Sequence, residues 1–106
     1  MPRDIAIGRK GDQLTGECLT PRFTMETSFG TLHFDKTNIR RIEFKGRNGL
    51  KHDEITTKRN DRSIGRLLTD PVEFQTEDGT THRLSKEALL ALLLNWGFDD
   101  NAEPLI

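Results

Sequence analysis

The stretch GDQLTGECLTPRFTMETSFGTLHF, residues 11–34, recurs 49 positions later as NDRSIGRLLTDPVEFQTEDGTTHR, residues 60–83. The overlay has no gaps, and the two stretches share these identical residues: Asp12/Asp61, Gly16/Gly65, Leu19/Leu68, Thr20/Thr69, Thr27/Thr76, Gly30/Gly79, Thr31/Thr80 and His33/His82. That is several times the number of matches that ordinary residue frequencies would produce by chance. Self-similarity at a fixed period indicates that the chain is built from two related units.

Each unit alternates apolar and polar residues over short runs that end at turn-forming residues. In the first unit these runs occupy residues 5–7, 14–18, 23–27, 32–34 and 39–44. Alternation bounded by Gly, Pro and Asp predicts half-buried antiparallel strands joined by tight turns. In the second unit Asp78-Gly79 is a strong hairpin signal, because both residues tolerate positive φ. We therefore expect a mostly β chain with two pseudo-symmetric modules, residues 1–50 and 51–106, which either share one barrel-like domain or form two tandem barrels.

The second unit ends differently from the first, with an apolar run. Residues 88–94 read ALLALLL; Ser85 before them is a favourable N-cap, and Glu87 would lie in the first helical turn. We therefore expect a short C-terminal helix at about residues 86–95, followed by an acidic tail. A strand stays open as the alternative. With a one-residue bulge, three leucines overlie the apolar positions that close the first unit: Leu89 on Ile39, Leu92 on Ile42 and Leu94 on Phe44.

Length and composition restrict the class of protein. A chain of 106 residues forms one compact domain or two very small ones that share a core. Cys18 is the only cysteine, so no disulfide can form within the chain. A single cysteine, with no signal-peptide pattern at the N-terminus, favours a reducing, cytoplasmic setting. No apolar stretch approaches the roughly 18 residues needed to cross a bilayer, so we expect no membrane partner.

No group of chemically active residues has the spacing of a catalytic or metal site. His33 and His82 hold equivalent positions in the repeat, but a metal ion needs three or four converging ligands. Only Cys18 and His52 could add further soft ligands. Residues 52–54, HDE, place an imidazole beside two carboxylates, yet general acid–base catalysis needs a pocket and perturbed pKa values. We therefore expect no enzyme, no metal site and no cofactor.

The middle of the chain is basic and the last part is acidic. Residues 40–66 contain nine Lys or Arg against four acids, whereas residues 67–106 contain two against eight. A basic stripe can neutralise phosphates and bind nucleic acid. Its candidate contacts are Arg40, Arg47, Lys51, Lys58, Arg59, Arg62 and Arg66. Between Phe44 and Phe74 no aromatic residue is present to stack on a base. The other interpretation is therefore that the basic middle pairs with the acidic second half, within one chain or between chains.

Three stretches of the first unit carry a family resemblance: residues 11–16 (GDQLTG), 23–25 (FTM) and 39–44 (IRRIEF). They resemble the small β-barrels of Sm-like and SH3-like proteins, present here as two tandem related modules. The resemblance implies a bent sheet with a short helical turn before the last strand. Sm-like proteins assemble as rings, so the resemblance also implies self-assembly.

The leucine-rich segment is the predicted contact surface. A helix that is apolar on every face must be buried on all sides, and so small a chain can hardly surround it. We expect a non-enzymatic interaction or assembly module that binds a second copy or another protein. The expected contacts of such a homo-oligomer are Leu89, Leu90, Leu93, Leu94, Trp96 and Phe98. Nucleic-acid binding by the basic middle is the alternative function, and a small-ligand site between the modules, near His33 and His82, is the third.

Overall fold

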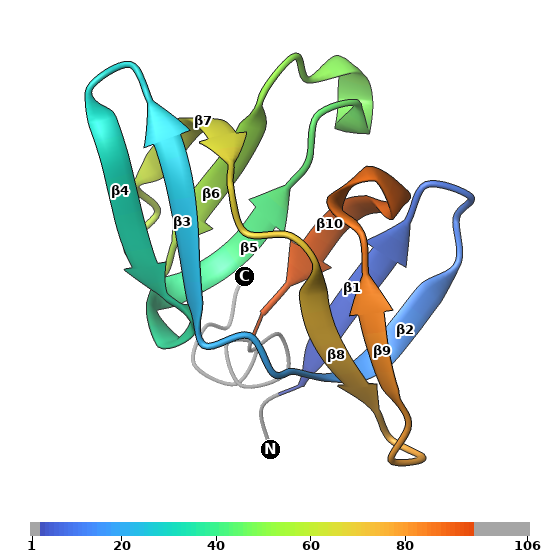
Figure 1. Ribbon diagram of the computed structural model, residues 1–106. Helices are drawn as coiled ribbons and strands as arrows, with labels where there is room; N and C mark the ends of the chain where they lie inside the picture. Colours follow the sequence, from blue (N-terminus) through green and yellow to red (C-terminus); the bar gives the residue numbers. More distant parts are fainter. Residues whose placement is uncertain (1–2, 95–106) are drawn as a thin grey trace.

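The computed structural model describes residues 3–94, which form one antiparallel sheet of ten strands (Figure 1). The strands are β1 (Asp4–Gly8), β2 (Gln13–Cys18), β3 (Arg22–Thr27), β4 (Gly30–Asp35), β5 (Ile39–Glu43), β6 (Asp53–Thr57), β7 (Arg62–Leu67), β8 (Val72–Thr76), β9 (Thr81–Leu84) and β10 (Leu89–Leu93). Short 3₁₀ turns lie at η1 (Lys36–Asn38), η2 (Arg47–Gly49) and η3 (Lys86–Ala88). The chain is mostly β, as the alternation predicts. Within residues 3–94 no helix is long and apolar enough to cross a membrane.

The strands of the two units interleave in the sheet. Their order is β4-β3-β7-β6-β5-β10-β1-β2-β8-β9, so β3 of the first unit pairs with β7 of the second, and β2 pairs with β8. Figure 1 shows two groups of strands side by side, which meet where β5 pairs with β10. Neither unit forms a continuous sheet by itself. The strand order therefore corresponds to one shared sheet rather than to two tandem barrels.

The predicted helix at residues 86–95 is wrong for the residues that the structure describes. Only the turn η3 forms at Lys86–Ala88, and the following leucines form β10, which lies between β1 and β5. Leu92, for example, pairs with Ala6 on one side and with Ile42 on the other. Helix propensity is a weak preference that tertiary context overrides. Here the strand satisfies the backbone groups of two neighbouring strands, which a helix could not do. The acidic tail lies outside the described residues.

The second unit contains one extra residue in its hairpin turn. β3 and β4 are joined by residues 28–29, with Thr27 opposite Gly30. In the other hairpin Thr76 N donates to Thr80 O at 2.9 Å, which leaves three residues in the turn between β8 and β9. As a result, β6 and β7 begin 49 residues after β1 and β2, whereas η3 and β10 begin 50 residues after η1 and β5.

This insertion separates the two histidines that the gapless overlay treats as equivalent. His33 lies opposite Thr24 in the hairpin of β3 and β4, and its side chain is exposed. His82 lies opposite Phe74, a buried residue, in the hairpin of β8 and β9. The two imidazoles therefore extend from opposite faces of their hairpins. The structural equivalent of His33, 50 residues on, is Arg83.

The core is continuous across both groups of strands. Its fully buried large side chains come from both units: Phe23, Met25, Ile39, Ile42, Phe44, Ile55, Leu67, Val72, Phe74, Leu92 and Leu94. Two glycines allow the strands to pack closely around it. A Cβ on Gly16 would lie 2.0 Å from the backbone oxygen of Gln75, and one on Gly65 would lie 2.1 Å from that of Glu26. Glycine is therefore required where β2 meets β8 and where β7 meets β3.

Candidate functional site

A buried ion pair ties η1 to the strands of its own unit. Asp4 on β1 is only 2% exposed, and its Oδ2 lies 2.8 Å from Nζ of Lys36. The same oxygen accepts a hydrogen bond from the backbone N of Cys18 at 2.7 Å. Lys36 also donates to the backbone oxygen of Cys18 at 2.8 Å. Buried charges are tolerated only when they are paired and hydrogen-bonded in this way, so the pair is structural.

The second unit repeats this arrangement. Asp53 Oδ2 lies 2.8 Å from Nζ of Lys86 and accepts from the backbone N of Leu67 at 2.7 Å, while Oδ1 accepts from the backbone N of Lys45 at 2.8 Å. Burial by itself would raise the pKa of Asp53, but the hydrogen bonds from Lys86, Leu67 and Lys45 outweigh it. The pKa of Asp53 is therefore held below its ordinary value, and the carboxylate is charged at neutral pH.

The run HDE at residues 52–54 does not form a catalytic group. Asp53 pairs with Lys86, whereas Glu54, which is also buried, lies on the other face of β6 and pairs with Arg62 at 2.9 Å. Cys18 is buried, and burial raises the pKa of its thiol to about 11, so it is protonated at neutral pH. In the described part of the chain, no cluster of three or more His, Cys, Asp or Glu side chains is placed to hold a metal ion.

The seven basic candidates for nucleic-acid contact lie in several places. Three are in ion pairs with glutamates: Arg47 with Glu43 at 3.2 Å, Arg62 with Glu54 at 2.9 Å and Arg66 with Glu26 at 2.8 Å. These acids come from residues 26–54 rather than from the acidic second half. Lys58 and Arg59 lie together in the turn between β6 and β7, Lys51 is exposed before β6, and Arg40 is half-buried on β5. The fold therefore does not gather the seven into one basic stripe.

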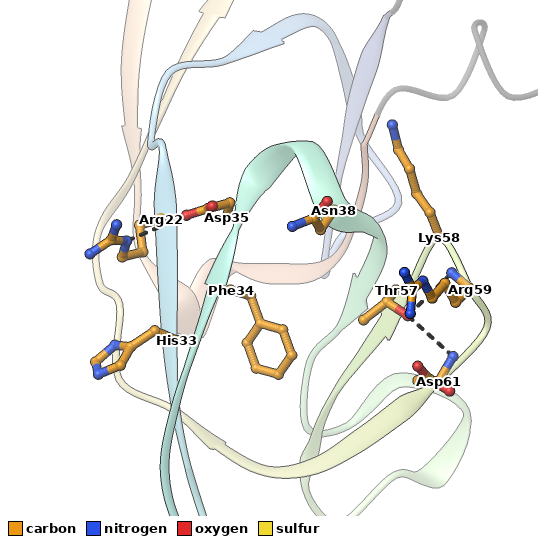
Figure 2. Close-up of a pocket in the computed structure, with 9 residues that line it drawn as sticks. All are labelled: Arg22, His33, Phe34, Asp35, Asn38, Thr57, Lys58, Arg59 and Asp61. Carbon is orange, nitrogen blue, oxygen red and sulfur yellow. Dashed lines mark hydrogen bonds and ion pairs between the residues drawn. The ribbon is translucent and has the colours of Figure 1, made fainter.

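A pocket of about 590 Å³ opens between β4, η1 and the turn that joins β6 to β7. We call it the Phe34 pocket; its lining residues are Arg22, His33, Phe34, Asp35, Asn38, Thr57, Lys58, Arg59 and Asp61. Figure 2 shows the ring of Phe34 in the middle, with the residues of the β6–β7 turn on one side and those of β3 and β4 on the other. The pocket is thus built from both units. His33 lines it and His82 does not.

Local contacts hold both walls of the Phe34 pocket. On one wall Arg22 Nε lies 3.5 Å from Asp35 Oδ1. On the other, Thr57 Oγ1 accepts hydrogen bonds from the backbone N of Arg59 at 3.3 Å and from that of Asp61 at 3.2 Å, as Figure 2 shows for the turn. The hydroxyl therefore fixes the backbone of the turn that carries two of the basic candidates.

A second surface lies at the tip of the β3–β4 hairpin. Three apolar side chains, which we call the hairpin patch, are exposed there: Phe29 at 96%, Ile64 at 51% and Leu32 at 39%. They line one groove of about 700 Å³, whose rim carries Arg62, Arg66, His52 and Glu26. β4 is an edge strand of the sheet, so its outer backbone groups have no strand partner among the described residues. A grouped set of exposed apolar side chains is typical of an interaction site.

The sequence analysis did not predict the hairpin patch, although the position of Phe29 in a turn indicates that this residue is exposed. Phe29 stands in the turn between two alternating runs, and a turn residue points to solvent whatever its hydrophobicity. No pattern in the sequence indicates that Ile64 is exposed, because its exposure depends on which face of β7 meets the core.

The leucine-rich segment lies mainly inside the molecule. Leu89 is 2% exposed and Leu94 is fully buried, so neither lies on the surface as the predicted contact requires. Leu90 and Leu93 are half-buried on β10. The remaining predicted contacts, Trp96 and Phe98, lie outside the described residues. The physical reason is that β10 lies between β1 and β5 in the middle of the sheet, where Leu89, Leu92 and Leu94 face the shared core.

Searches with this chain against models of protein families, against curated proteins and against solved structures found no match.

Proposed function

We propose that this chain is a non-enzymatic assembly module that binds a second copy of itself through the hairpin patch. The observation that carries the proposal is the 96% exposure of Phe29 beside the exposed Leu32 and Ile64. Burial of apolar surface drives most protein association, and large aromatic side chains supply much of the binding energy.

The apolar character of the patch supports a second copy as its partner. In a twofold contact each patch meets the same patch, so apolar side chains face apolar side chains. The groove carries charges of both signs, since Arg66 and Glu26 lie on its rim. The unpaired edge of β4 lies next to the patch, and an edge strand is a ready template for pairing with another chain.

The proposal assigns no catalysis to the chain. Its buried carboxylates, Asp4 and Asp53, are held by lysines and backbone donors, which suits a structural role. The buried, protonated thiol of Cys18 supports a cytoplasmic setting, where a single cysteine stays reduced.

The related strand positions supply the test variants. Thr15 holds the position on β2 that Ile64 holds on β7, so the fold already tolerates threonine there, and Phe29 is 96% exposed in its turn, where a polar residue loses no packing. Light scattering across a concentration series should give a dimer for the natural chain and a monomer for the double variant Phe29→Asp/Ile64→Thr. The matched control is Leu19→Ser, which removes a leucine that is 39% exposed elsewhere and should leave the dimer intact.

Two results would contradict the proposal. The first is a natural chain that stays monomeric at every concentration. The second is a double variant that dimerises as strongly as the Leu19→Ser control.

A further inference from the structure

We propose that the Phe34 pocket binds an unstacked nucleotide, with the base on the ring of Phe34 and the phosphate at Arg59. This site is separate from the hairpin patch and does not depend on self-assembly. The ligand chemistry is the same whether the nucleotide is free or is one unit of a single strand.

The first argument is the aromatic ring. Phe34 is half-buried near the end of β4 and packs against the core, and Figure 2 shows its ring among the residues that line the pocket. Aromatic side chains bind single-stranded nucleic acids by stacking, because every base offers a π face. The basic middle has no aromatic residue of its own, and the fold supplies one from another strand.

The second argument is the position of the positive charge. Lys58 and Arg59 follow β6 directly, and the backbone N of Lys58 donates to the backbone oxygen of Asn38 at 2.9 Å. This bond fixes the turn against η1, beside the ring. Among residues 3–94 the guanidinium of Arg59 forms no ion pair, unlike those of Arg62 and Arg66. It is therefore available to an external anion.

The third argument concerns selectivity. The pocket also carries Asp61 next to the ring, while Asp35 is already engaged by Arg22. A carboxylate repels a plain polyanion, but it accepts hydrogen bonds from the amino groups of bases. The lining therefore suits a base with a single phosphate better than the backbone of a duplex. A volume of about 590 Å³ lies within the usual range of small-ligand sites.

The counterpart of the Phe34 pocket is the corner where β9 and η3 meet the turn between β1 and β2. This corner forms without the equivalents of Phe34 and Asn38. There Leu84 lies opposite Val72, as Phe34 lies opposite Phe23. Ala88 is the counterpart of Asn38, 50 residues on. The strands and the turn form equally well without the aromatic ring or the amide. Phe34 and Leu84 both pack against the core, so an aliphatic side chain serves the packing at this place as well as an aromatic one.

The equivalent turn between β1 and β2 also carries two basic residues. Arg9 is the counterpart of Lys58, and its guanidinium donates to the backbone oxygens of Glu87 at 2.6 Å and Lys45 at 2.8 Å. Lys10, the counterpart of Arg59, has no aromatic neighbour of the Phe34 kind and serves as the matched control.

The test measures binding of fluorescently labelled single-stranded RNA and DNA of about ten nucleotides, which covers one small-barrel site. A parallel arm titrates adenosine and cytidine monophosphates into the isotopically labelled protein and follows backbone amide shifts. The variants are Phe34→Leu, which introduces the residue of the related corner, and Arg59→Glu, with Lys10→Glu as control. Circular dichroism checks that each variant is folded.

We expect binding that Phe34→Leu and Arg59→Glu each weaken roughly tenfold or more, the effect of losing one stacked base. Lys10→Glu should change the affinity by less than about threefold. One neutralised phosphate predicts a slope of log Kobs against log salt of about −0.7 on a single strand. If the monophosphates shift the amide signals of residues 57–61, a free nucleotide is sufficient for binding. If only the oligonucleotides bind, the ligand is a nucleotide within a single strand.

Three outcomes would overturn the inference. They are no binding of any probe at low salt, equal affinity of Phe34→Leu and the natural chain, and equal losses for Lys10→Glu and Arg59→Glu. The last result would mean that the strand is attracted by general charge and not by this pocket.

Discussion

Replacing Asp53 by alanine should destabilise the fold far more than breaking an exposed ion pair of the same length. Asp53 accepts three contacts within 2.8 Å, from the backbone N of Lys45, the backbone N of Leu67 and Nζ of Lys86. Alanine leaves the two backbone donors without their acceptor and leaves Nζ of Lys86 with only the backbone oxygen of Leu67, at 2.7 Å. The exposed reference is Arg66 with Glu26, whose Nη2–Oε1 distance is also 2.8 Å.

Burial determines the difference in magnitude between these two pairs. The side chains of Asp53 and Lys86 are 3% and 22% exposed, whereas those of Glu26 and Arg66 are 53% and 67% exposed. Removing one partner of a buried pair costs about 3–5 kcal/mol, because the other partner stays buried and uncompensated. An exposed pair contributes less than about 1 kcal/mol, since water and salt screen it. A domain of this size is stable by only about 5–15 kcal/mol in total.

Urea unfolding followed by circular dichroism measures both effects. With a slope of roughly 1–2 kcal/mol per molar urea, Asp53→Ala should lower the midpoint by about 2 M or more, and Glu26→Ala by well under 1 M. Asp53→Asn keeps the side-chain volume and one acceptor oxygen, so its urea midpoint should lie between those of Asp53→Ala and Glu26→Ala. It also provides a measurement if Asp53→Ala does not fold. Equal midpoints for Asp53→Ala and Glu26→Ala would refute the reasoning from burial.

Three further predictions follow from single residues. The hydrogen bonds from Lys86, Leu67 and Lys45 hold the pKa of Asp53 below its ordinary value, so its contribution to stability is complete above the ordinary pKa and is lost as the pH falls through the lowered one. Acid titration of Lys86→Met should show a smaller loss of stability. Gly65→Ala should lower the free energy of unfolding by about 1–3 kcal/mol or more, because its Cβ would meet the backbone of Glu26, and an unchanged urea midpoint would contradict the close approach. Cys18, with a thiol pKa of about 11, should react with a thiol reagent at pH 8 much more slowly in the folded chain than in urea, and equal rates would show that the thiol is accessible.

Much of the local structure could be predicted from the sequence. The alternating runs at residues 14–18 and 23–27 became β2 and β3, and the Asp78-Gly79 signal lies in the turn that joins β8 to β9. These features are local, because side-chain alternation and turn-forming residues act over a few neighbouring positions. The apolar overlay of Leu89, Leu92 and Leu94 on the first unit, offered as the alternative to a helix, describes the observed strand.

The candidate sites were less predictable. Of the basic candidates, only Lys58 and Arg59 line the Phe34 pocket, and the ring at its centre comes from β4. No spacing along the chain connects Phe34 to Arg59, because they meet only when hairpins of different units pack together. The inserted residue in the β8–β9 turn was also invisible to a gapless overlay, so His82 was matched to the wrong partner.

The sequence by itself predicted a mostly β chain of short strands in two similar stretches, and it excluded a disulfide within the chain. Only the tertiary structure decided that β10 is a strand, that the two units interleave, and which residues line the pocket and the patch. The physical reason is that a strand is completed by the backbone of its neighbours. Which edges meet depends on contacts between residues far apart in the chain, and no local pattern encodes them.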